Sequence, residues 1–121
     1  MLAAITFSID YSLDDESFED FIELAAPISS DWAEELEVQY REEDGLVVRL
    51  VTNDDEELFI TKEHFENTLF DVLVGKFDGE LKTSIIDSFK RAALDGDTTM
   101  LDATDGDALL QLAAFGEIVY G

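Results

Sequence analysis

The residues of this sequence best placed to do chemistry are its carboxylates, since the chain of 121 residues has 30 Asp and Glu against seven Lys and Arg. Four of them recur at helical spacing, which puts them on one face of a helix: Glu16, Glu19, Asp20 and Glu23. Each like-charge pair at this spacing costs about 0.2–0.5 kcal/mol in an isolated helix. An ordinary solvated face would interleave Lys with Glu, yet the first basic residue is Arg41. The series favours a surface that a basic partner recognises, and the alternative is a merely solvated helix face.

Further carboxylates extend this pattern through the N-terminal half of the chain. They lie in a predicted strand and in two predicted turns, and we name them together with the helix series the acidic surface. It is the predicted partner-binding site, and its remaining members are Asp31, Glu34, Glu35, Glu37, Glu42, Glu43, Asp44, Asp54, Asp55, Glu56 and Glu57. Exposed aromatic residues such as Trp32 or Tyr40 would supply desolvated anchors within it.

The segment 95–107 is rich in Asp, Thr and Gly, which suggests calcium because hard cations take oxygen ligands. The EF-hand register fails. A loop that started at Asp95 would need Gly at its sixth position and Glu at its twelfth, but these are Met100 and Gly106. We expect Asp and Thr to cap the following helix and to fill a turn. No metal site is predicted, although divalent binding by this loop stays open.

The sequence offers little for catalysis. His64, the only histidine, lies beside Glu63 at the start of a predicted helix without a nucleophile signature, which favours a surface or capping role. Gly75-Lys76 lacks the preceding spacing of a phosphate-binding loop. With so many carboxylates, any two fall close by chance, so a paired-carboxylate site has no support. We predict no enzyme, no catalytic residue and no cofactor.

The net charge of −23 accompanies an apolar content of 46%, which is that of a folded domain rather than of a disordered acidic tail. The length suits one domain over residues 1–121. Such a charge opposes direct binding to nucleic acids or anionic membranes, which require Lys and Arg. There is no cysteine, no basic segment at the N-terminus and no run of about 20 apolar residues, so we expect a cytoplasmic protein.

Hydrophobic periodicity predicts the elements that would position these residues. A first strand is expected over 2–11, and then a helix that Ser12 caps and Pro27 ends. Three strands joined by tight acidic turns follow, at 35–41, 46–52 and 57–60, with the second in the centre. Helices are expected after Thr61, from Leu81 to near Gly96 and over 108–115, and residues 118–120 would add a terminal strand. The fold class is therefore α+β, an antiparallel sheet of three to four strands (an N-terminal strand plus a meander) with about four helices on one face.

In size and composition the chain resembles the loose class of DNA-mimic inhibitors, which includes anti-restriction and anti-CRISPR proteins of phages and immunity proteins against nuclease toxins. These proteins share no motif, so the resemblance assigns no residue. It implies an acidic inhibitor that blocks the nucleic-acid site of a basic nucleic-acid-binding protein or nuclease complex. The alternative is a halophile-adapted domain with no charge-specific partner, and a small enzyme ranks third. The oligomeric state is left open.

Overall fold

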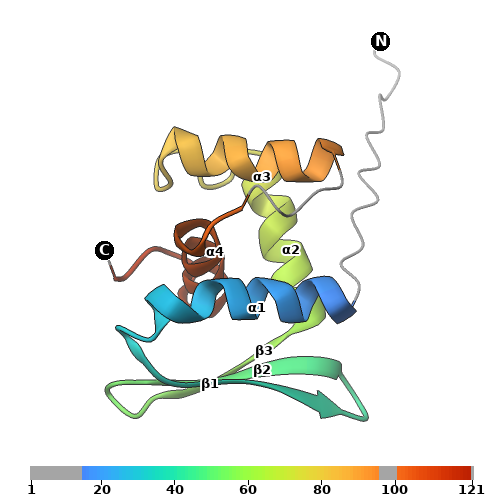
Figure 1. The fold of residues 1–121 in the computed structure, drawn as a ribbon, viewed down its shortest axis with the longest axis vertical. Helices are drawn as coiled ribbons and strands as arrows, with labels where there is room; N and C mark the ends of the chain where they lie inside the picture. Colours follow the sequence, from blue (N-terminus) through green and yellow to red (C-terminus); the bar gives the residue numbers. More distant parts are fainter. Residues whose placement is uncertain (1–14, 96–100, 121) are drawn as a thin grey trace.

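A computed structural model describes residues 15–95 and 101–120. It confirms the predicted α+β class, with four helices and a three-stranded antiparallel sheet in the described chain. Figure 1 shows the helices stacked on one side of the sheet. The predicted strand over 2–11 and the Ser12 cap lie outside the described residues. The elements in chain order are α1 (Asp15–Ser29), β1 (Ala33–Arg41), β2 (Gly45–Thr52), β3 (Glu57–Thr61), α2 (Lys62–Leu73), α3 (Thr83–Asp95) and α4 (Ala103–Phe115).

The sheet is the predicted meander, in the order β1-β2-β3 with β2 in the centre. Gly45 closes the first hairpin turn with a φ of 71°, in the left-handed region that glycine adopts freely. Residues that pair across the strands share a face. The helix-facing rows are Leu36, Leu50 and Leu58, then Val38, Val48 and Ile60, while the outward rows are Glu35, Val51 and Glu57, then Glu37, Arg49 and Phe59.

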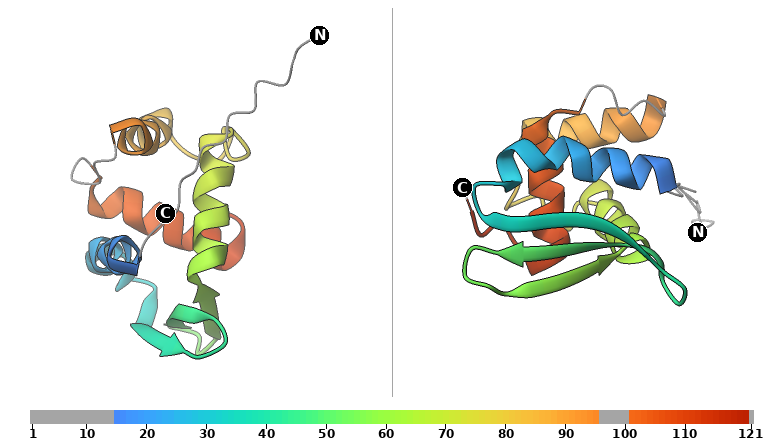
Figure 2. Two further views of the ribbon diagram at one scale, coloured as in Figure 1. Left: turned by 90° about the vertical axis from the view of Figure 1, so that its right-hand side faces the viewer. Right: turned by 60° about the horizontal axis from the view of Figure 1, so that its bottom comes forward.

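Aromatic rings join the helices in the core. Phe65 of α2 meets Phe18 and Phe21 of α1 edge to face, with ring centroids 5.3 Å and 5.6 Å apart. Helix α4 crosses α1 so closely that a Cβ added at Gly106 would lie 3.0 Å from the backbone nitrogen of Ala25. Figure 2 shows the crossing from two further directions. This packing fixes α1, and with it the acidic helix face, above the sheet.

Two predicted helix boundaries and one predicted strand were wrong. Helix α1 continues through Pro27 to Ser29. Pro27 cannot donate to the carbonyl of Glu23 and its ring crowds that carbonyl, but burial of Ala25 and Ser29 holds the last turn against the core. Helix α4 begins at Ala103 instead of 108, because Asp102 caps it and the acidic segment forms its first turns. Residues 118–120 form no strand, because their backbone N–H groups bond to a side chain of α4 instead of a strand edge.

Candidate protein-interaction surface

All fifteen carboxylates of the acidic surface are solvent-exposed. Four lie on α1, three on β1 and one at the start of β3, and the rest lie in the turns around the sheet. Helix α1 faces the core with Phe18, Phe21 and Ile22, so its acidic series faces solvent, as the periodicity predicts. The structure therefore leaves every predicted contact carboxylate accessible, while the partner itself stays a prediction.

The acidic surface follows one long side of the molecule. Helix α1 and strand β1 run antiparallel beside each other (Figures 1 and 2). The two acidic turns lie at opposite ends of the sheet, because consecutive turns of a meander must, and β2 separates them by about 27 Å for its eight residues. They do not form one compact patch with each other. The acidic face of α1, about 22 Å long over fifteen residues, runs between the two ends.

Hydrogen bonds fix the end of the acidic surface at which Asp31 and the β2–β3 turn lie. The side-chain amide of Asn53 donates to the carbonyl of Asp31 (3.0 Å), and the Asn53 backbone N–H donates to the carbonyl of Trp32 (3.0 Å). Within the turn, the Glu56 N–H donates to the hydroxyl of Thr52 (3.2 Å). Asp31 and the β2–β3 turn are thus held together by hydrogen bonds.

Two members of the acidic surface, Glu35 and Glu57, form salt bridges with an arginine of the same chain. Arg49 extends over the outward face of the sheet, where its guanidinium donates to Glu35 (2.7 Å) on one neighbouring strand and Glu57 (2.9 Å) on the other. Beside it, the guanidinium of Arg41 lies 4.0 Å from the centroid of the Phe59 ring. Because these arginines neutralise charge locally, the outward sheet face is a weaker attractor of cations than the α1 face.

The aromatic anchors have separate outcomes. Trp32 was wrong as an exposed anchor, because only 3% of it is accessible and its ring stacks on Tyr120 at a centroid distance of 5.1 Å. Tyr40 is 73% exposed next to the β1–β2 turn and stays available to a partner. The sequence gives no signal of which side Trp32 faces, because residues 28–34 have no clear periodicity.

A buried polar network explains why Trp32 is internal. Asp107 of α4 is 7% exposed and its Oδ1 accepts hydrogen bonds from Ser29 Oγ (2.7 Å) and Trp32 Nε1 (2.8 Å). Its Oδ2 accepts from Gln111 Nε2 (2.8 Å). Gln111 Oε1 in turn accepts from the backbone N–H groups of Val119 and Tyr120 (2.9 and 2.8 Å). Sequence reasoning missed this network, since Asp107 looked like one more residue of an acidic loop.

The N-terminus of α4 confirms the predicted capping role of the acidic segment. The Asp102 side chain accepts from the Asp105 N–H (2.9 Å), and the Asp105 side chain accepts from the Asp102 N–H (3.0 Å), which is a capping box. Asp105 is only 5% exposed. Burial, with repulsion from Asp102, raises the pKa of the Asp105 carboxyl above its ordinary value of 3.8.

We expect Asp105→Asn to stabilise the fold at neutral pH. A carboxyl whose pKa is higher in the folded state costs stability where it is ionised, and this cost disappears as the pH falls through the folded pKa to below the unfolded value. The amide oxygen keeps the bond from Asp102 without the charge. The gain in unfolding free energy, measured by urea denaturation, should be present at pH 7 and shrink toward pH 4 or so. A gain independent of pH would contradict this account.

The remaining candidate features are His64, potential metal ligands and one pocket. The His64 ring lies within hydrogen-bond distance of the Ala113 carbonyl (2.8 Å from Nε2) at the end of α4, which fits the predicted surface or capping role. No group of three potential metal ligands occurs in residues 15–95 and 101–120. A pocket of about 370 Å³ opens between the start of α3, α4 and the C-terminal segment. Its two buried polar side chains, Asp107 and Gln111, already take part in the hydrogen-bond network described above.

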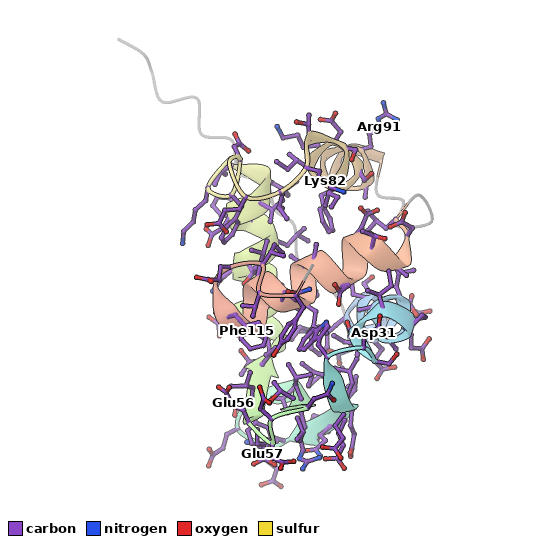
Figure 3. The ribbon with its side chains drawn as sticks, turned by 90° about the vertical axis from the view of Figure 1, so that its left-hand side faces the viewer. Asp31, Glu56, Glu57, Lys82, Arg91 and Phe115 are labelled. Atoms are coloured by element: carbon purple, nitrogen blue, oxygen red, sulfur yellow. The ribbon has the colours of Figure 1, made fainter. Side chains whose placement is uncertain are left out.

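The charge is unevenly distributed over the molecule. Residues 15–61 hold sixteen Asp and Glu and two basic residues, whereas residues 82–95 hold two acidic and three basic residues. Figure 3 shows the contrast: Lys82 and Arg91 lie at the α3 end, and Glu56 and Glu57 lie at the opposite, sheet end. The anionic field is therefore strongest on the side formed by α1 and the sheet.

Fold and surface together define a small α+β domain with an acidic strip along α1 and the sheet. A scan against protein-family models and searches of curated proteins and of solved structures find no match to this chain. Within the described part of the chain, every helix is too short or too polar to cross a membrane.

Proposed function

We propose that this protein is an inhibitor that mimics the charge of a nucleic acid and blocks the nucleic-acid site of a DNA- or RNA-handling protein. The main support is the exposure of all fifteen carboxylates of the acidic surface, together with the near absence of basic residues among them. The inhibitor class is that of anti-restriction, anti-CRISPR or nuclease-immunity proteins, and the expected compartment is the cytoplasm.

Inhibition would be competitive. Helix α1 rises 5.4 Å per turn, so its carboxylates present a row of negative charges on the length scale of a phosphate backbone. Lys and Arg in the target groove pair with this row, and the complementary fields speed the encounter. Because the row is attached to a helix whose inner face is buried, binding orders little of the inhibitor's backbone, and this part of the entropic cost of association stays small.

The first experiment combines enzymatic and thermal measurements. Purified nucleases and restriction enzymes are assayed for cleavage of a labelled duplex, with and without the protein, at several salt concentrations. We expect the protein to inhibit at least one of these enzymes. Excess duplex should relieve the inhibition by competing for the same site, and the inhibition should weaken as the salt concentration rises. A pull-down from a lysate at low and high salt supplies further targets for the same assay.

Thermal unfolding separates this function from halophilic adaptation. A charge mimic should be folded at about 0.15 M salt, where it must act, whereas a halophilic domain should unfold without molar salt. Melting by circular dichroism at low and molar NaCl makes the comparison. A protein that folds only in molar salt, and that inhibits none of the enzymes, would contradict the proposal.

A further inference from the structure

A groove separates α1 from β1 in the middle of the acidic surface. It has a volume of about 290 Å³ and opens to solvent. Its floor is apolar, and its rim on the α1 side carries Glu19 and Glu23. The floor residues are Ile22, Ala26, Leu36 and Val38. Sequence reasoning did not detect this groove, because it forms between two elements whose relative placement depends on the core.

The chemistry of the groove fits a long cationic side chain. An arginine buries its aliphatic stem on apolar surface while its charged end stays near water. Glu19 and Glu23 are one helical turn apart, with Cβ atoms about 5–6 Å from each other, a spacing that a planar guanidinium can bridge. The guanidinium is also more weakly hydrated than the lysine ammonium, so entry into a half-apolar groove costs it less.

We propose that this groove receives an arginine side chain of the basic partner, with the stem on the apolar floor and the guanidinium between Glu19 and Glu23. The inference rests on the proposed function and adds a specific contact to it. Elsewhere on the acidic surface, charges meet across solvent and contribute mainly to encounter rate. In the groove, the arginine becomes largely desolvated and acts as an anchor.

Charge and shape are tested with two matched double variants of the same helix. Glu19→Gln with Glu23→Gln removes the rim, while Glu16→Gln with Asp20→Asn removes the same charge at the same spacing outside the groove. The probe is a short, fluorescently labelled arginine-rich peptide, and the measurement is its affinity at about 0.1 M salt. We expect the rim variant to lose about tenfold and its control about threefold.

Two further comparisons isolate the stem. Ala26→Leu fills the floor without a change of charge and should weaken binding as much as the rim variant. A second peptide, in which each arginine is replaced by an analogue with a shorter stem and the same guanidinium, should bind the parent protein weakly and should show no difference between the two double variants. Circular dichroism checks that all variants keep the fold.

The outcomes separate this inference from the proposed function. Equal losses of peptide affinity in the two double variants, or full affinity in Ala26→Leu, would overturn the proposal that the groove binds arginine. Inhibition of nucleic-acid enzymes could persist in that case. An absence of inhibition in every enzyme assay, with the groove behaving as expected toward the peptide, would overturn the proposed function and leave an arginine-binding groove.

Discussion

Neutralising the acidic face of α1 is expected to weaken inhibition of the target about thirtyfold at moderate salt, since the four carboxylates contribute on average about 0.5 kcal/mol each. The variant carries Glu16→Gln, Glu19→Gln, Asp20→Asn and Glu23→Gln. All four side chains are exposed, so the core contacts of α1 are untouched. The fold should be intact or slightly more stable, because like charges three and four residues apart no longer repel.

The measurement is the inhibitor concentration that halves cleavage of a labelled duplex, determined over a range of salt concentrations. The variant should also show a shallower salt dependence, because fewer charges pair in the complex. The matched control removes four exposed carboxylates from α2, α3 and the segment between them: Glu63, Asp78, Glu80 and Asp87. It has the same net charge and should inhibit nearly as well as the parent. Equal losses in both variants would show that total charge, and not the α1 face, governs inhibition.

The sequence predicts the fold to a large extent because its strong signals are periodic. Alternation along 35–41 and the turns at Asp44-Gly45 and at 53–56 define the meander, and the apolar stripe of Phe18, Phe21 and Ile22 defines which side of α1 is buried. Exposure of the acidic residues follows directly, since burying an ionised carboxylate without partners is costly. These features are local, and local patterns can be recognised without knowing the tertiary structure.

What the sequence did not predict depends on contacts between distant residues. Asp107 is buried because Ser29 and Trp32, more than seventy residues earlier, supply its donors. In isolation it has the same signature as the exposed Asp102. The groove between α1 and β1 likewise depends on how far the core holds the helix from the sheet. Such features become visible only when the packing is known.

The largest effect on stability is expected from Asp107→Asn, which should lower the unfolding free energy by about 2–3 kcal/mol. The substitution removes a charge-assisted hydrogen bond and leaves one buried donor facing another donor. The carboxylate accepts at both oxygens, from Ser29 and Trp32 on one side and Gln111 on the other. An amide offers only one acceptor, so either orientation places its NH₂ group against a donor. Gln111 cannot rotate to compensate, because its oxygen already holds two backbone N–H groups.

Urea denaturation followed by the fluorescence of Trp32 measures this effect, because Trp32 is the only tryptophan and it donates a hydrogen bond to Asp107. The control is Asp105→Asn, two residues earlier in the same helix. Both substitutions replace a nearly buried Asp by its isostere and remove one negative charge, yet we expect opposite signs at neutral pH. Asp105 accepts a single bond that an amide can also accept, whereas Asp107 accepts three. If relief of the overall anionic charge dominated stability, both variants would be stabilised, and the network around Asp107 would be dispensable. Opposite signs would show that three donors compensate the buried charge of Asp107, whereas the single donor of Asp105 does not fully compensate its charge.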